Sequence, residues 1–507
     1  MRTPPLPTLL FCLLSLALSA QATRLFTIGP GKDYTRITDF PWEDLVAGDV
    51  VEIHHNGSAY REKFNVAAIG TVAAPVTVRG VPDAAGNLPV ITGENAVSRP
   101  QLDYWNQYRA PIRIGEALVP LHGQTPSYIV IENLEIRSAR APYTFTNTAG
   151  NTEAYHERTA GIYVEAGTYL TIRNCTIRDC GNGLFTSHNT YDVLVEGCRL
   201  FENGIVGSDR YHNAYTESHS ITYQFNYIGP QRPDCRGNAV KDRSSGTVIR
   251  YNWVEGGAKQ LDLVDSDYAD IYTLASYDRT YVYGNVLIEA ESDPGNKIVQ
   301  YGGDSKVWER YRSGTLYFYH NTVISKRTGA AALFRLDGSS IQCLNNILYA
   351  PNGLVMMIGN DSTVTASGNW ITSGTIADSA INQFGDFPGW RDFAAHELTL
   401  RADSPCLDAG DALPGAIPAA HRVQYEYRAL AAANVRDDAG SPDLGAFAFY
   451  GVRTSQATDD VYAPIEDTRL YIPPALGLLA NDRVDLDYPA RPILLQAPAH
   501  GSVSLAG

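Results

Sequence analysis

A short motif, in which an apolar strand leads into Asn and a further apolar pair, recurs through the middle of this chain. Its copies align on what we call the ladder positions: Cys175, Cys198, Asn226, Asn252, Asn285, Asn321, Asn346 and Asn369. Their spacings are 23, 28, 26, 33, 36, 25 and 23 residues. A base period near 23 is too short for a propeller blade, and the motif has no helical periodicity. The repeat therefore predicts an all-β chain folded as a right-handed parallel β-helix, with insertions in the turns between strands.

The repeated Asn has a structural explanation. In a stack of parallel coils, each side-chain amide can bond the backbone of its own turn and the amide of the next coil. We expect these residues to form a buried polar ladder, and we do not assign them to catalysis. The composition agrees with a β-rich fold, since 31 Tyr and 44 Gly accompany only 3 Met.

The repeat divides the chain into segments. Residues 1–22 are predicted to be a signal peptide, because an apolar stretch from Leu9 to Leu18 precedes Ala20-Gln21-Ala22. A membrane anchor is the alternative, disfavoured because no second apolar run follows. The protein is expected to be secreted, or to lie in the periplasm or on the surface of a bacterial cell. Residues 23–372 form the predicted β-helix, and 373–451 its capping region.

The last segment, residues 457–507, has short apolar runs separated by acidic turns such as Thr458-Asp459-Asp460 and Ala480-Asn481-Asp482. It resembles the start of the Ig-like, cadherin-like repeats of bacterial secreted and surface proteins. An incomplete Ig-like β-sandwich is therefore expected after the β-helix.

The net charge limits the partners. A formal charge of −15 argues against nucleic acid and anionic membranes. An acidic sugar polymer stays compatible if positive charge gathers locally at a site. We expect a monomer without a transmembrane segment.

The same spacing predicts which polar residues stack. Tyr215 lies 11 residues before Asn226, and Lys241 lies 11 before Asn252. Equal offsets of 14 and 9 residues place two further pairs side by side, so the neighbours are Tyr215 with Lys241, His212 with Asn238, and Glu217 with Arg243. Alternate residues of a strand share a face. Inward Ala214 and Val240 then send outward Tyr215, Glu217, Lys241 and Arg243, with the strand ending at Asp242.

The following coil extends this patch. Inward Leu261 and Leu263 would send Gln260 and Asp262 to the same outer face. Asp262, Asp265 and Asp267 could hold a calcium ion, which favours several carboxylates in a flexible site; solvated acids in an insertion loop are the alternative. Asn213, Asn238, His188 and Gln260 are the predicted substrate-binding residues.

The repeat, the Asn ladder and the capping region resemble the pectin-lyase-like superfamily of right-handed β-helix proteins over residues 25–450. The resemblance implies a polysaccharide lyase acting on a uronate polymer by β-elimination, with calcium or a basic side chain neutralising the uronate carboxylate. Lys241, with a depressed pKa, would be the base, Arg243 would bind the carboxylate, and His212 or Tyr215 would protonate the leaving oxygen.

Three other interpretations stay open at this level. The first is a glycoside hydrolase built on paired aspartates. The second is a carbohydrate-binding or adhesin module without catalysis. In the third, Lys241 and Arg243 form a structural ladder of ion pairs with Glu217 and Asp262.

Overall fold

The computed structural model describes residues 23–449 except 119, 120, 122, 157, 360, 373–381, 429–433 and 437–439, and scattered positions between 459 and 503. The predicted leader, residues 1–22, and most of the Ig-like segment, 457–507, lie outside the described residues, so both stay predictions. In the described part of the chain, no helix has the length and apolar character needed to cross a bilayer.

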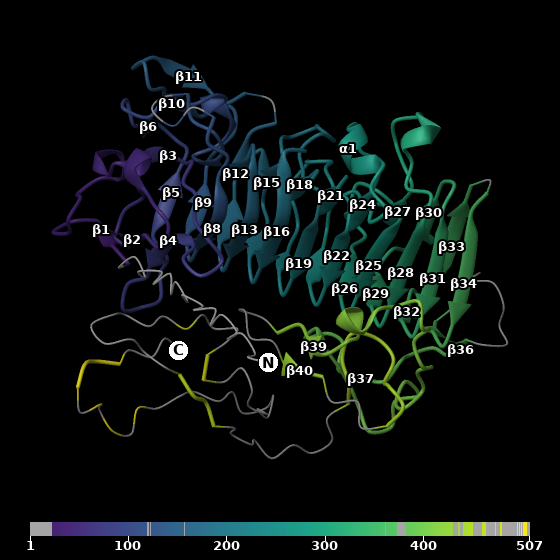
Figure 1. The fold of residues 1–507 in the computed structure, drawn as a ribbon. Helices are drawn as coiled ribbons and strands as arrows, with labels where there is room; N and C mark the ends of the chain where they lie inside the picture. Colours follow the sequence, from purple (N-terminus) through teal and green to yellow (C-terminus); the bar gives the residue numbers. More distant parts are fainter. Residues whose placement is uncertain are drawn as a thin grey trace, which may run out of the picture.

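Three long sheets run the length of the molecule as one stack (Figure 1). Sheet A contains β1 (Leu25–Ile28), β2 (Val50–His54), β4 (Val76–Val81), β8 (Ser127–Glu132), β13 (Gly167–Arg173), β16 (Thr190–Glu196), β19 (Ile221–Gln224), β22 (Thr247–Arg250), β25 (Arg279–Tyr283), β28 (Thr315–Tyr319), β31 (Ser340–Leu344) and β34 (Thr363–Ser367). Sheet B contains β5 (Val90–Thr92), β9 (Glu135–Arg137), β14 (Thr176–Arg178), β17 (Arg199–Leu200), β20 (Tyr227–Ile228), β23 (Trp253–Glu255), β26 (Val286–Glu289), β29 (Thr322–Ser325), β32 (Ile347–Tyr349), β35 (Trp370–Ile371) and β36 (Gln383–Phe384).

Sheet C carries the candidate site. It contains β11 (Thr152–Ala154), β10 (Thr144–Thr146), β6 (Ala96–Ser98), β3 (Glu62–Val66), β7 (Ile112–Ile114), β12 (Ala160–Val164), β15 (Asn182–Thr186), β18 (Ala214–Thr216), β21 (Val240–Asp242), β24 (Leu261–Leu263), β27 (Lys297–Tyr301), β30 (Ala331–Leu336) and β33 (Leu354–Ile358). Consecutive coils pair in parallel, as β18 with β21 and β21 with β24, while β10 and β11 are antiparallel. The predicted parallel β-helix is confirmed.

Aliphatic side chains from successive coils stack on one another and fill the interior of the solenoid. On sheet C, Leu184, Ala214, Val240, Leu261 and Val299 follow one another in register, and all are fully buried. Burial of these apolar rows on every coil supplies the main stabilisation of the solenoid.

The predicted Asn ladder is also confirmed. The Nδ2 of Asn226 donates to Oδ1 of Asn252 at 2.9 Å, and that of Asn252 donates to Oδ1 of Asn285 at 2.9 Å. The row continues upward through Asn321, Asn346, Asn369 and Asn382. The residue before each ladder Asn turns the chain with a left-handed backbone, as Tyr251 (φ 56°) and Gly284 (φ 65°) do. The amide then bonds the backbone of this turn, as Asn252 does with the carbonyl of Arg250.

The region expected as a cap packs along the side of the solenoid in its described part (Figure 1). It includes β37 (Trp390–Asp392), β38 (Glu397–Leu400), η5 (Ala419–His421), β39 (Tyr425–Glu426) and β40 (Asn434–Val435). Trp390 packs in a cluster with Ile347 of sheet B, and the Tyr319 hydroxyl donates to the carbonyl of His421. The amino-terminal coil is covered by η1 (Ile37–Asp39) and η2 (Trp42–Asp44). Trp42 stacks on Phe64, with the ring centroids 4.1 Å apart.

Two insertions project side by side from the ends of neighbouring strands of sheet C (Figure 1). The first follows β24 and contains α1 (Ala269–Tyr272); the second follows β27 and contains η4 (Trp308–Arg310). They contact each other, because Arg310 pairs with Asp267 at 3.0 Å. A further insertion nearer the amino terminus contains η3 (Gln107–Arg109).

Candidate functional site

The outer face of sheet C carries a row of side chains in register. Phe185 lies beside Tyr215, Tyr215 beside Lys241, Lys241 beside Asp262, and Asp262 beside Gln300. The predicted pairing of Tyr215 with Lys241 and the end of the strand at Asp242 are thereby confirmed. An aromatic row thus leads into a charged one, because Phe185 and Tyr215 stack with ring centroids 4.9 Å apart.

Lys241 lies between two carboxylates. Its Nζ donates to Asp262 at 3.0 Å and to Asp304 at 2.5 Å. Burial lowers the pKa of Lys241 and so does Arg243, but Asp262 and Asp304 more than offset both, and the net shift is upward. The expected depressed pKa is therefore wrong, and Lys241 is an ammonium ion in this arrangement.

Arg243 spreads its donors over three partners. Its Nε donates to the Tyr215 hydroxyl at 3.0 Å, its Nη2 to Asp304 at 2.9 Å, and its Nη1 to the carbonyl of Asp265. The expected neighbour Glu217 turns elsewhere, and accepts hydrogen bonds from Ser266 Oγ and the Asp267 amide. Arg243 therefore points into the site, where oxygen atoms of Tyr215, Asp265 and Asp304 accept its hydrogen bonds.

Asp304 was not predicted from the sequence, although it completes the site. One of its carboxylate oxygens accepts from Lys241 and the other from Arg243. Burial raises the pKa of Asp304, but Lys241 and Arg243 together lower it by more than burial raises it, so the net shift is downward. It lies in the insertion after β27, which gives the largest ladder spacing, 36 residues. This long spacing is the only feature of the sequence that points to the insertion carrying Asp304.

His212 and Asn238 support this cluster from behind. The Nδ1 of His212 accepts the backbone N–H of Asn238 at 2.9 Å, which confirms that they are neighbours. Burial, and then Lys241, lowers the pKa of His212 to about 3, so its ring is neutral at physiological pH. The Asn238 amide donates to Asp262 at 2.7 Å. Both residues fix the positions of charged groups.

Two of the predicted substrate-binding residues are fully buried. Asn213 is fully buried, and its amide bonds Asn203 and the carbonyl of Gly229. Gln260 is also fully buried, because β24 begins at Leu261 and leaves Gln260 in the preceding turn, where it bonds the carbonyl of Gly256. The expected outward position of Gln260 is therefore wrong.

His188 and Glu217 lie at the corner between sheets C and A. His188 stacks on Tyr268 with ring centroids 3.5 Å apart, and burial lowers its pKa. Burial likewise raises the pKa of Glu217, which favours its protonated form. Glu217 is the carboxyl in this cluster most suited to donate a proton.

The three aspartates proposed for calcium have separate partners. Asp262 pairs with Lys241 and with Lys259, at 2.7 Å, and Asp267 pairs with Arg310. Asp265 accepts the backbone N–H of Asp304 at 2.6 Å. Within the described residues, no three His, Cys, Asp or Glu side chains gather as metal ligands do. This donor set does not fit calcium as it stands, so no chemical step is derived through a metal, and calcium binding stays a prediction.

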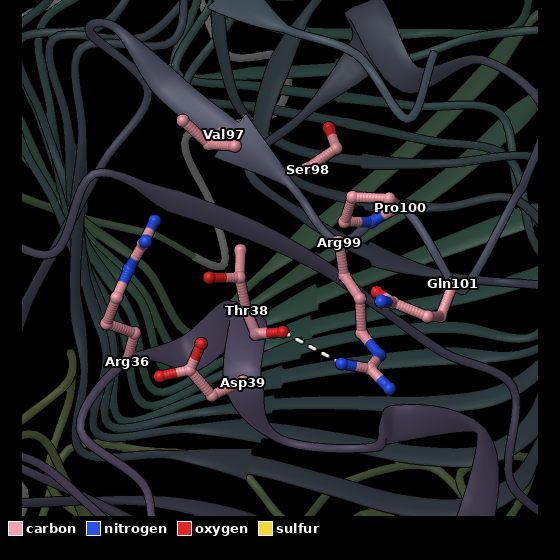
Figure 2. A pocket seen from close by; sticks show the side chains of 8 residues that line it. All are labelled: Arg36, Thr38, Asp39, Val97, Ser98, Arg99, Pro100 and Gln101. Carbon is pink, nitrogen blue, oxygen red and sulfur yellow. Dashed lines mark hydrogen bonds between the residues drawn. The ribbon is translucent and has the colours of Figure 1, made fainter. Parts of the chain in front are cut away.

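A separate hollow of about 460 Å³ lies at the amino-terminal end of the stack (Figure 2). Arg99 on its wall donates to the carbonyl of Thr38 at 2.9 Å and pairs with Glu43 at 2.6 Å. β6, which borders it, lies six strands from β21 in sheet C, about 29 Å at a strand spacing of ~4.8 Å. The charge of Arg99 is neutralised by Glu43, and the hollow is remote from Lys241.

The model of a family described as "right handed beta helix region" matches residues 124–287. With the parallel sheets, this match shows that the chain contains a right-handed parallel β-helix. No curated protein matches the chain.

Several solved structures resemble the fold. The pectate lyase Pel9A aligns with a TM-score of 0.49 and 13% identity, over 85% of this chain and 98% of its own. An alginate lyase from Paenibacillus sp. str. FPU-7 aligns with a TM-score of 0.40 and 13% identity, over 68% and 93%. The GH136 lacto-N-biosidase from Eubacterium ramulus aligns with a TM-score of 0.39 and 10% identity, over 72% and 68%. At these identities the likeness concerns the fold alone.

Proposed function

We propose that this protein binds an acidic polysaccharide across the outer face of sheet C and cleaves it by β-elimination. One observation carries the proposal: Lys241 and Arg243 converge on the two oxygens of a single carboxylate, at 2.5 and 2.9 Å. A uronate carboxylate needs this kind of neutralisation before the proton on the adjacent carbon can be removed, because negative charge flows onto the carboxylate as that proton leaves.

Several cations lie around this point together with the carboxylates that pair with them, although the chain as a whole carries −15. Lys259 pairs with the far oxygen of Asp262. Lys297 lies close to Lys259 and Arg335, and its pKa is lowered by burial and by both of these cations. These cations give an acidic polymer groups to pair with on this face, in competition with the carboxylates of the protein.

The side chains then divide the chemistry. In β-elimination, a base removes the proton beside the carboxylate, a carbon–carbon double bond forms, and the glycosidic oxygen leaves with a proton. Lys241 and Arg243 stabilise the developing charge. Tyr215 lies next to both cations, and its hydroxyl oxygen accepts a hydrogen bond from Arg243, so we assign both proton transfers to Tyr215. Its oxygen receives the proton from the carbon beside the carboxylate, and a proton passes from it to the leaving glycosidic oxygen. His212 is less suited, because it is neutral and buried.

A direct assay tests this proposal. The wild-type protein is incubated with pectate, alginate and glycosaminoglycans, and the ultraviolet absorbance of the unsaturated uronate is followed. We expect a signal that falls at least about 100-fold in Lys241→Ala and Arg243→Ala. Arg310→Ala is the matched control. It also removes a cation, but one that pairs with Asp267 between the two insertions rather than with Asp304.

Two other results would replace the proposal. Release of reducing ends without the ultraviolet signal would indicate hydrolysis, with Glu217 as the acid because burial raises its pKa. Retention of the polymer on immobilised protein, without cleavage of either kind, would indicate a carbohydrate-binding module.

A further inference from the structure

We infer that Asp304 occupies a subsite for one carboxylate group, and that an acidic sugar binds by displacing the Asp304 side chain from between Lys241 and Arg243. This inference rests on the proposed function and specifies where the charged group of the substrate sits. Asp304 is then an internal competitor of the substrate.

The geometry is that of a bound ligand. Each oxygen of Asp304 contacts a different cation, at 2.5 Å from Lys241 Nζ and 2.9 Å from Arg243 Nη2. A carboxylate has the size and charge for this two-point contact, whereas a hydroxyl offers only one oxygen. A uronate carboxylate can reproduce both contacts.

Asp304 is also the replaceable partner of the cluster. Its side chain is 31% exposed, whereas that of Asp262 is 1% exposed. Asp262 is further held by Asn238 and Lys259, at 2.7 Å each. Lys241 therefore keeps one fixed carboxylate and can exchange the other.

The backbone of the insertion need not move for this exchange. The backbone N–H of Asp304 is held by Asp265 Oδ1, and Arg312, farther along the insertion, is anchored to Asp242 inside the solenoid. Rotation of the Asp304 side chain toward solvent is sufficient, and such rotamer changes are fast for exposed side chains.

Charge balance then favours an acidic ligand. Lys241, Arg243 and Lys259 face the carboxylates of Asp262, Asp265 and Asp304. When Asp304 rotates away, one positive charge is left without a counterion in a mostly buried site. A ligand carboxylate restores the balance, and a neutral sugar leaves it unpaired.

A small carboxylate tests the subsite without any sugar. The melting temperatures of wild type, Asp304→Ala and Asp267→Ala are measured in sodium acetate and in sodium chloride of equal ionic strength. We expect acetate to raise the melting temperature of Asp304→Ala alone, by a few degrees. Asp267→Ala is the control, since it removes a carboxylate from the adjacent insertion. Asp304→Gly repeats the test should the alanine variant fold poorly, and no acetate effect in a folded variant would overturn the inference.

Sugar binding separates this inference from the proposed function. Calorimetry with tetrasaccharides of pectate and alginate should give about tenfold tighter binding to Asp304→Ala than to wild type, equivalent to about 1.4 kcal/mol. Equal affinities would overturn the displacement of Asp304. An acetate effect in Asp304→Ala, with no binding of either tetrasaccharide to any form, would keep the carboxylate subsite and refute the proposed function.

Discussion

Arg312 reaches into the interior of the solenoid and pairs with Asp242 at 3.1 Å, with neither side chain exposed to solvent. Asp242 lies between Lys241 and Arg243 in the chain, and its carboxylate also accepts hydrogen bonds from Thr216 and Thr247. Arg312 belongs to the insertion that carries Asp304. One buried ion pair therefore ties the strand that presents both cations to the insertion that presents their counterion.

Arg312→Ala should destabilise the protein by about 3–5 kcal/mol, because it leaves the Asp242 carboxylate charged and buried without its cation. Urea unfolding followed by circular dichroism measures the change. Arg310→Ala, which breaks the exposed pair with Asp267, should cost no more than about 0.5 kcal/mol. Similar losses in both variants would contradict a special role of the buried pair.

Asn285→Ala should interrupt the Asn ladder at its centre and cost about 2–4 kcal/mol, because buried partners lose their hydrogen bonds. The Asn285 amide donates to the carbonyl of Ile249 at 2.9 Å, and its oxygen accepts from Asn252. Urea unfolding gives the loss. Asn189→Ala, in an exposed turn, is the matched control, and an equal effect there would argue against the ladder as a source of stability.

His212 should make folding sensitive to mild acid. Burial lowers its folded pKa to about 3, so the unfolded state binds a proton below about pH 6.5 that the folded state does not. The contribution of His212 to stability is therefore complete above pH 6.5 and is lost as the pH falls toward 3. Between pH 7.5 and 5.0 the loss should be about 2 kcal/mol, and His212→Gln should remove that part of the dependence. An unchanged pH profile in the variant would contradict the low pKa.

Tyr215→Phe should lower kcat by about 10²–10⁴-fold with KM nearly unchanged, because it removes a proton-transfer group and keeps the ring that stacks on Phe185. Steady-state kinetics on the preferred polymer provide both constants. Tyr163→Phe is the control, since Tyr163 belongs to the same row two strands earlier. A change in KM alone would assign Tyr215 to binding.

Much of the site could be predicted because the solenoid fixes its own register. Once the ladder Asn residues were aligned, Tyr215 had to lie beside Lys241, and His212 beside Asn238. Turn insertions do not disturb that arithmetic, because the chain returns to the next rung after each one. Gln260 was placed wrongly since it belongs to a turn, where strand alternation does not apply.

Asp304 and Arg312 could not be predicted in the same way. Both lie in the longest insertion, where no repeat relates a residue to its neighbours in space. The pKa of Lys241 is raised by Asp262 first and then by Asp304. Asp262 was available from the repeat as a neighbour of Lys241, whereas the second carboxylate comes from the irregular insertion and was missed.

A crystal structure of Tyr215→Phe soaked with a uronate tetrasaccharide tests the central claim most directly. The proposed mechanism predicts one sugar carboxylate between Lys241 Nζ and the Arg243 guanidinium, with the Asp304 side chain rotated toward solvent. A tetrasaccharide bound elsewhere on the solenoid, with Asp304 still bridging Lys241 and Arg243, would contradict it.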